Sequence, residues 1–289
     1  MLKSRLSIFT TRSRRLVFPT TQSLTISSSS SSTSTTKRTI NSDSLFALNL
    51  QCKVRPEIRN EWLKQIQEDQ LCSRRDEPDC LQFVLGQGVD DENAFYLFEL
   101  YRNKEAFQHH GQTPHFQIYN NFIESSQPYI GEPEVCFYHP LEETDSTTKR
   151  SIQKNSFGLN VNLYPKASVR NDFLKAISDN KKGTDTTEPL ALQYFYGEAT
   201  NAPGQPELDG DTTTSTSTST TSTSTSTTST STTSTKPFYL HEQYSGDNHG
   251  KEGFDAHASS PHFAAWEDFV ATDPFEKAPE VFFFRILEP

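Results

Sequence analysis

The stretch ELYRNKEAFQHHGQTPHF, residues 99–116, decides the fold because the chain contains it twice. The second version is EQYSGDNHGKEGFDAHASSPHF, residues 242–263. The residues that recur in the same order are Glu99, Tyr101, Phe107, His110, Pro114, His115 and Phe116, as Glu242, Tyr244, Phe254, His257, Pro261, His262 and Phe263. An internal repeat of this kind determines the architecture before any other pattern does.

The repeat extends outward from this stretch. FALN at 46–49 recurs as FGLN at 157–160, and RNEWLKQI at 59–66 recurs as RNDFLKAI at 170–177, with one offset, 157−46 = 170−59 = 111. The offset rises to 238−95 = 143 and then settles at 279−133 = 146. A duplicated domain with one large insertion in its second half explains these offsets. We call residues 45–140 copy one and residues 156–287 copy two; residues 141–155 read as a polar linker.

The sequence of each copy predicts the element order β-α-β-β-α-β, which is a ferredoxin-like unit of the α+β class. Alternating or continuous apolar runs predict the strands, and Pro56 and Thr113-Pro114 mark helix starts. In copy one the expected strands are 46–54, 80–85, 95–101 and 135–139, with a helical turn at 104–110.

The two copies are expected to face each other. Helices can cover only one face of a four-stranded sheet, yet 95–101 and 282–284 are apolar on both faces. The sequence therefore predicts a fused, pseudo-dimeric α+β barrel that encloses a cavity, with the helices outside. Further association into oligomers is compatible with this arrangement.

Residues 1–42 resemble an organelle transit peptide. They contain seven basic residues, no acidic residue and much Ser and Thr; the basic residues are Lys3, Arg5, Arg12, Arg14, Arg15, Lys37 and Arg38. A mitochondrial location is favoured over a plastid one, and a plain disordered tail is the alternative. Removal would change the net charge from −10 to −10−7 = −17, which argues against nucleic acid or an anionic membrane as the main partner.

The insertion in copy two covers about residues 199–236, between the second and third strands of that copy. Its centre, 212–235, consists only of Ser and Thr, so it cannot bury a core and is expected to be disordered. A regulatory loop that is modified is the alternative interpretation.

The cysteines and histidines do not predict a metal site. Cys52, Cys72, Cys80 and Cys136 all lie in copy one and form no CxxC pair, so buried reduced thiols are expected. Of His109, His110 and His115, only the last two recur in copy two. A ligand set intrinsic to the fold would be expected in both copies.

Acidic and histidine residues of the repeated stretch are candidates for acid–base chemistry. Glu99 lies in an apolar strand, and a buried carboxylate needs a partner, for which His110 is the candidate. Glu242 and His257 are the equivalent pair. Either pair could be a structural hydrogen bond or an acid–base pair. His115 and His262 stand at the second residue of a helix, where the dipole disfavours the imidazolium; they could be exposed or line a pocket.

The opposite strand faces are expected to line the cavity. Asn49 and Asn160 lie on the polar face of the first strand of each copy. Copy one adds Tyr96 and Phe98, whereas copy two adds Tyr239, His241 and Gln243 as substrate-binding or catalytic candidates. Because His241 stands where copy one has Phe98, the chemistry is predicted around Asn160, His241, Glu242 and His257.

FYLFELYRNKEAFQHHGQTPHF, residues 95–116, resembles the antibiotic biosynthesis monooxygenase family of dimeric α+β barrel proteins. The early Asn-bearing strand, the acidic-Pro break and the H-x-x-T/S-P-H-F element agree in both copies. The family includes cofactor-free quinol or phenol oxygenases, haem-degrading enzymes and an isomerase of a phosphorylated hydroxy-dione. The haem-degrading type uses a histidine on the second long helix, but 117–120 here reads QIYN.

The resemblance implies a cofactor-independent monooxygenase that acts on a small phenol- or quinol-like molecule. An electron-rich, deprotonated ring can react with oxygen when an apolar pocket orients it and polar groups stabilise the anion. The alternatives are an isomerase of a small hydroxy-dione and a barrel that only binds a small hydrophobe. A phosphate on the substrate would need a cation, and Lys53 is the candidate on the first strand.

Overall fold

The structure is a computed structural model that describes residues 45–141, 156–201 and 236–287. The predicted transit peptide, most of the linker and the Ser/Thr tract lie outside the described residues. In the part of the chain that is described, no helix combines the length and the apolar character needed to cross a membrane.

Copy one begins with strand β1 (Phe46–Lys53), the 3-10 turn η3 (Pro56–Ile58) and helix α1 (Arg59–Asp76). Strands β2 (Cys80–Gly88) and β3 (Ala94–Tyr101) form a hairpin. Helices α2 (Lys104–His110) and α3 (Pro114–Ser126) follow, and strand β4 (Glu134–Pro140) ends the unit.

Copy two repeats this order with β5 (Phe157–Leu163), η4 (Ala167–Val169) and α4 (Arg170–Thr187). Strands β6 (Ala191–Ala199) and β7 (Phe238–Tyr244), helices α5 (Lys251–Ala258) and α6 (Pro261–Val270), and strand β8 (Glu280–Leu287) complete it. The β-α-β-β-α-β prediction is therefore correct for both copies. Strand β2 extends beyond the expected end at residue 85, where it pairs with β8 of the other copy.

Helix starts follow the capping chemistry of the sequence. The Thr113 side chain accepts a hydrogen bond from the Phe116 N–H, and Ser260 does the same for Phe263. A proline follows each cap at the first helical position, where a missing N–H costs nothing. This local chemistry places the histidine after each proline at a defined point beside the sheet.

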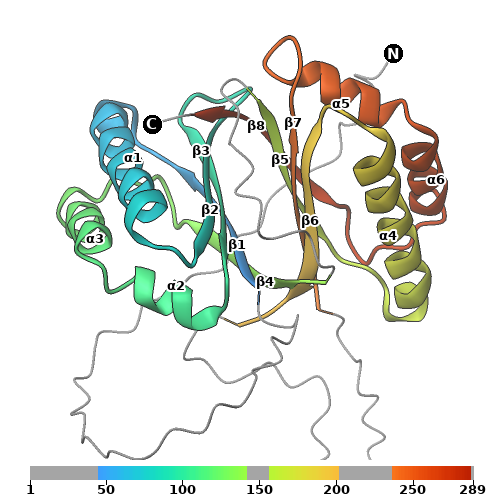
Figure 1. The fold of residues 1–289 in the computed structure, drawn as a ribbon, viewed down its shortest axis with the longest axis horizontal. Coiled ribbons are helices and arrows are strands. Elements are labelled where there is room, and N and C mark those ends of the chain that lie inside the picture. The colour runs from blue at the N-terminus through green and yellow to red at the C-terminus, as the bar shows by residue number, and fades with distance from the viewer. Residues whose placement is uncertain (1–44, 142–155, 202–235, 288–289) are drawn as a thin grey trace, which may run out of the picture.

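The eight strands of the described residues close into a barrel in the order β1-β3-β2-β8-β5-β7-β6-β4. The two copies join where β2 pairs with β8 and where β4 pairs with β6, both antiparallel. These pairings leave neither sheet with an open edge. Figure 1 shows the strands in the middle, with α1 and α3 of copy one on one side and α4 and α6 of copy two on the other.

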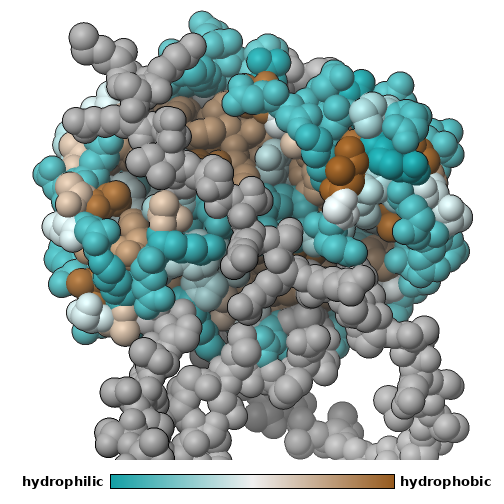
Figure 2. Space-filling model, turned by 180° about the vertical axis from the view of Figure 1, so that it is seen from behind, coloured by the Kyte–Doolittle hydropathy of each residue, from teal (hydrophilic) through white to brown (hydrophobic). Residues whose placement is uncertain are grey.

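Each helix layer packs on the outer face of its own sheet around equivalent aromatic pairs. The Trp62 ring lies 4.6 Å from Phe95 in copy one, and Phe173 lies 4.8 Å from Phe238 in copy two. Hydrophilic residues cover most of the outer parts of the face in Figure 2, while hydrophobic ones gather towards the middle.

Side chains of both copies pack against each other at the centre of the barrel, where the sequence predicted a lined cavity. Phe98 stacks on His241 with ring centroids 3.9 Å apart and planes at 7°. Phe195 lies 5.4 Å from Phe98, and Phe284 lies 6.2 Å from His241. Bulky rings from both copies meet near the axis, so these residues form a core.

Two asparagines connect the copies across this core. Asn49 Nδ2 donates to the Leu240 carbonyl of copy two at 2.8 Å, and Asn160 Nδ2 donates to the Leu97 carbonyl of copy one at 3.4 Å. Since 160−49 = 111 and 240−97 = 143 are the repeat offsets, the two bonds are the same contact made in both directions. This reciprocity is typical of a two-fold interface.

We predict that the two copies unfold as one unit. Trp62 and Trp266 are the chain's two tryptophans, one in each copy. In a Trp62→Phe background, the fluorescence of Trp266 reports the unfolding of copy two. Adding Asn49→Ala should lower the urea midpoint of this Trp266 transition. The reason is that a buried carbonyl in copy two loses its donor, at a cost of about 1–3 kcal/mol.

The control is far-UV circular dichroism of the same variants, which should give the same midpoints as fluorescence. If Asn49→Ala leaves the midpoint of the Trp266 transition unchanged, the two copies unfold independently.

Candidate functional site

The candidate site lies between the helices and the outer face of β3, not inside the barrel. Glu99 is 6% exposed and faces the helices. The Tyr101 hydroxyl donates to Glu99 Oε2 at 2.6 Å. The expected partner of Glu99, His110, is close enough to act on its charge but hydrogen-bonds elsewhere. Tyr101 has this role because it stands two residues along the same strand face.

Glu77, at the end of α1, is the acceptor that both histidines of copy one share. Its Oε1 lies 2.8 Å from His110 Nδ1 and 2.7 Å from His115 Nε2. Since an ionised carboxylate can only accept, both ring nitrogens donate. The Ser73 hydroxyl lies 3.4 Å from His110 Nδ1 and 3.3 Å from His115 Nε2. Neither histidine is an open, solvated helix-start residue: His110 is buried and His115 is 12% exposed.

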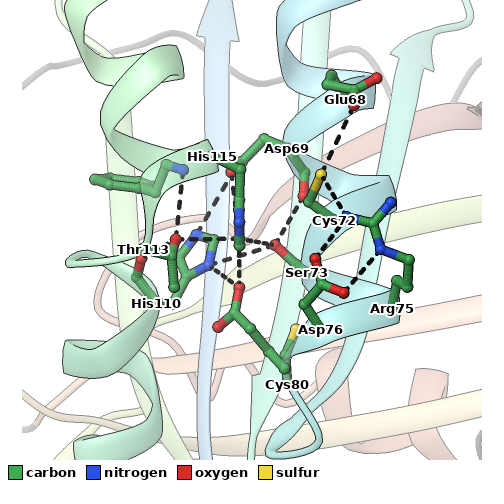
Figure 3. Close-up of polar contacts among 12 residues, drawn as sticks. Glu68, Asp69, Cys72, Ser73, Arg75, Asp76, Cys80, His110, Thr113 and His115 are labelled. Carbon is green, nitrogen blue, oxygen red and sulfur yellow. Dashed lines mark hydrogen bonds and ion pairs between the residues drawn. The ribbon is translucent and has the colours of Figure 1, made fainter.

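Asp69, like Ser73 and Glu77, is a member of the site that the sequence-based prediction missed. It lies on α1, 2% exposed, with Oδ2 at 3.7 Å from His110 Nε2 and Oδ1 at 3.9 Å from His115 Nε2. Its Oδ1 is buried and has no hydrogen-bond partner within the described residues. Figure 3 shows Asp69 and Ser73 facing the two histidines. The copy-one cluster is Asp69, Ser73, Glu77, Glu99, His110 and His115.

Burial and charge separate the pKa values within this cluster. Burial raises the pKa of Asp69 to about 7; His110 opposes this shift, whereas Glu99 and Glu77 add to it. Burial also raises the pKa of Glu99. For His110, burial acts to lower the pKa, but the Glu77 hydrogen bond and the charges of Glu99 and Asp69 outweigh it, so the net shift is upward. The pKa of Glu77 is lowered, because its bonds to the histidines outweigh burial.

These values suit proton transfer. Glu77 stays ionised and holds the rings in place, while Asp69 can gain or lose a proton near neutral pH. Groups whose pKa values are pushed apart in a buried setting are typical of acid–base sites.

Copy two builds an equivalent cluster with one different chemical group. Glu188 Oε1 accepts from His257 Nδ1 at 3.0 Å, and His262 Nε2 is its second donor. The Tyr244 hydroxyl donates to Glu242 at 2.7 Å. At the position of Asp69, with 180−69 = 111, stands Asn180, an amide that does not titrate. This difference between the repeats is the sequence signal that could have pointed to Asp69.

The residues predicted to act together in copy two lie on opposite faces of the sheet. Glu242 and His257 face the helices, whereas Asn160 and His241 face the barrel, where His241 Nδ1 lies 2.8 Å from Asn160 Oδ1. A strand alternates its side chains between faces, so neighbours such as His241 and Glu242 cannot share one pocket. Burial alone lowers the pKa of His241 well below its usual value, and its ring is fully enclosed.

The remaining barrel-side candidates are also packed among other side chains. Tyr96 stacks on Phe282 and Phe284 at 5.7 and 5.4 Å, and burial raises its pKa to about 12. Tyr239 lies 6.0 Å from Tyr138. Gln243 is fully buried, with no hydrogen-bond partner for its side chain among the described residues. Tyr96 and Tyr239 line the interior as predicted, are part-exposed and contact aromatic neighbours.

Within residues 45–141, 156–201 and 236–287, two sets of side chains are close enough to be considered as metal ligands: Asp69, His110 and His115, and Glu188, His257 and His262. Ligands on one tetrahedral zinc ion with bonds of about 2.0–2.2 Å lie roughly 3.4 Å apart. In the first set the Asp69 oxygens lie 3.7 and 3.9 Å from the histidine nitrogens, close to this spacing, but His115 Nε2 donates to Glu77 at 2.7 Å. In the second set both histidines donate to Glu188. A ring nitrogen that carries a proton cannot bind a metal, so the described arrangement is a hydrogen-bond network.

Comparison with known proteins agrees with this fold. A family model described as antibiotic biosynthesis monooxygenase matches residues 45–121, within copy one. The Bacillus subtilis (strain 168) protein described as "Putative monooxygenase YcnE" is 30% identical over 89 residues, 31% of this chain and 90% of that protein. An uncharacterized protein of Synechocystis, sll1783, is 28% identical over 94 residues, 32% of this chain and 61% of that protein.

Solved structures resemble both copies together. A "putative monooxygenase" of Lactobacillus acidophilus NCFM has a TM-score of 0.61 at 16% identity, covering 84% of this chain and 94% of its own. A second, from Fusobacterium nucleatum, has a TM-score of 0.60 at 13% identity, covering 85% and 93%. At these identities the similarity shows the fold alone.

We predict that Asp69→Asn stabilises the protein in a pH-dependent way. The pKa of Asp69 rises from 3.8 to about 7 on folding, so the unfolded state ionises first. The wild type therefore loses stability as pH rises from about 4 to 7, while the neutral amide does not. Urea unfolding should show an advantage for the variant of about 1–3 kcal/mol at pH 8 that shrinks towards pH 4. An advantage that is equal at both pH values would contradict a buried, titrating Asp69.

Proposed function

Because the chain belongs to the antibiotic biosynthesis monooxygenase family, we propose that it oxidises a small phenol- or quinol-like substrate with molecular oxygen at the copy-one cluster. The observation that carries this proposal is Asp69. Its carboxyl group is buried, has an oxygen without a hydrogen-bond partner, and has a pKa of about 7. Such a group can act as a general base near neutral pH.

The first step is removal of the phenolic proton. A phenol has a pKa of about 10, so Asp69, with its pKa near 7, can take the proton when the buried site and nearby donors stabilise the anion. His110 is the nearest such donor, with Nε2 3.7 Å from Asp69 Oδ2. Glu77 holds His110 through Nδ1 and so directs Nε2 towards the reacting region.

Oxygen then reacts with the phenolate. The ring supplies the electron pair that forms the new carbon–oxygen bond, and the peroxide anion takes the proton held by Asp69, which gives a hydroperoxide. Asp69, again unprotonated, takes the proton from the ring carbon, the O–O bond breaks, and the departing hydroxide takes this proton from Asp69 to form water. The balance is phenol + O₂ → quinone + H₂O, with the substrate as the source of all electrons, so the reaction needs no added cofactor.

Aromatic side chains around the cluster suit a ring-shaped substrate. Phe116 lies 4.9 Å from the His110 ring, and Tyr101 and Phe83 lie 5.8 and 6.2 Å from it. Phe116 and His115 are the part-exposed members, so we place substrate entry beside them. Aromatic pairs prefer such edge and offset contacts.

Two features favour an oxygenase over the two alternatives, an isomerase and a protein that only binds a hydrophobe. Lys53, the candidate cation for a phosphate, pairs with Asp91 at 2.6 Å, which disfavours an isomerase of a phosphorylated hydroxy-dione. An acid–base cluster with a carboxyl oxygen free to accept a proton favours chemistry over mere binding of a hydrophobe.

The test is oxygen uptake by purified, chelator-treated protein with a panel of hydroquinones, naphthols and anthrones. We expect turnover that survives the chelator and rises with pH through about 7, because Asp69 must be unprotonated. Asp69→Asn should reduce the rate by about 10²–10⁴-fold.

The matched control is His241→Phe, a buried barrel residue replaced by the residue copy one has there. It should keep its activity. Full activity in Asp69→Asn, or loss of activity in His241→Phe, would contradict the copy-one cluster as the site and would favour a site inside the barrel. Turnover without oxygen uptake would favour the isomerase, and tight binding without turnover would favour a binding protein.

A further inference from the structure

Two positions distinguish the clusters of the two copies, and in copy two their side chains contact each other. Asn180 Nδ2 donates to the Tyr194 hydroxyl at 3.1 Å. In copy one the equivalent residues are Asp69 and Phe83, since 180−69 = 194−83 = 111. Phe83 has no hydroxyl to offer, and Asp69 keeps an oxygen without a partner within the described residues.

The remaining members of the clusters are the same or similar. Both copies keep the shared glutamate and its two histidines, and both keep the Glu–Tyr pair on the strand. Thr184 replaces Ser73 and lies 3.3 Å from His257 Nδ1. The scaffold is thus retained, and the chemical change is confined to the coupled pair Asp69/Phe83 against Asn180/Tyr194.

The physical effect of the pair follows from hydrogen bonding. A tyrosine hydroxyl beside Asp69 would donate to the ionised carboxylate and stabilise it. A phenylalanine leaves the carboxylate without that donor. In copy two the amide is neutral at every pH and the hydroxyl accepts its N–H, although Asn180 Oδ1 is itself buried without a described partner. Copy two therefore has no group equivalent to Asp69 that could exchange a proton.

We propose that the chain has a single acid–base site, in copy one, and that the residue at position 83 or 194 decides whether its cluster exchanges protons or is purely structural. Phe83 is then a positioning residue for Asp69, and the copy-two cluster is a structural brace that joins α4, α5 and α6 to the sheet. The number of sites per chain rests on the proposed function; the difference in titration does not.

Titratable side chains from several packed elements surround Asp69 and Asn180. Asp69 is faced by Glu77 of α1, Glu99 of β3, His110 of α2 and His115 of α3. Their counterparts around Asn180 are Glu188, Glu242, His257 and His262. Copy two differs in the ion pair of buried Lys181 with Asp185, whose charge acts on Tyr194. Exchanging the two pairs therefore tests the pairs within four matching neighbours.

The first test is Phe83→Tyr in the full chain. The new hydroxyl should donate to Asp69 and shift its titration, followed by side-chain carboxyl ¹³C NMR, to lower pH by about one unit. The pH–rate profile should shift by the same amount. A loss of packing alone would not move a titration, so an unmoved Asp69 signal in a folded variant overturns the proposal.

The second test is the double change Asn180→Asp with Tyr194→Phe, which gives copy two the residues of copy one. One additional carboxyl should titrate near pH 7, and oxygen uptake should rise up to about twofold. Tyr194→Phe alone is the control and should leave the rate and the carboxyl titration as they are.

A folded double variant with no additional near-neutral carboxyl overturns the proposal. If the double variant does not fold, Phe83→Tyr decides alone. If the carboxyls behave as expected but no substrate consumes oxygen, the proposed function fails while the assignment of one proton-exchanging cluster stands.

Discussion

Closure of the sheet is the constraint on which the rest of the structure depends. Each four-stranded unit would leave β2 and β4, or β6 and β8, with unpaired backbone groups. Pairing of β2 with β8 and β4 with β6 satisfies them and forces the inner faces together. Asn49 and Asn160 then reach across to the opposite copy. The inner faces then pack against each other around Phe98 and His241.

The structure changes how two differences between the copies are interpreted. His241 against Phe98 looks like a functional difference, yet the two rings stack at 3.9 Å in the core, where an imidazole whose pKa is lowered can replace a phenyl ring. Asn180 against Asp69 looks conservative, yet it removes the carboxyl that titrates near pH 7. Asn and Asp have nearly the same shape but different chemistry, whereas His and Phe differ in chemistry but can occupy the same position in a packed core.

Much of the fold could be predicted from the sequence because the signals are local and occur twice. Thr113-Pro114 and Ser260-Pro261 cap helices through their own backbone neighbours. Strand alternation assigned Glu99 to the helix side and Phe98 to the barrel side, as observed. The site was harder to predict from the sequence, because Glu77 and Asp69 are separated from His110 by 33 and 110−69 = 41 positions in the chain. Such distances in the chain leave no periodic pattern.

The sequence by itself determined the duplication, the β-α-β-β-α-β order, the faces of the strands and the family, since each of these rests on repeated residues or on local hydrogen bonding. Only the tertiary structure decided that Phe98 stacks on His241 inside the barrel and that Glu77 rather than Glu99 binds the histidines. It also decided that Asp69 lies beside them with one oxygen that has no partner among the described residues. The reason is physical: packing and the pKa of a buried group depend on what surrounds a side chain in space, and those neighbours come from distant parts of the chain.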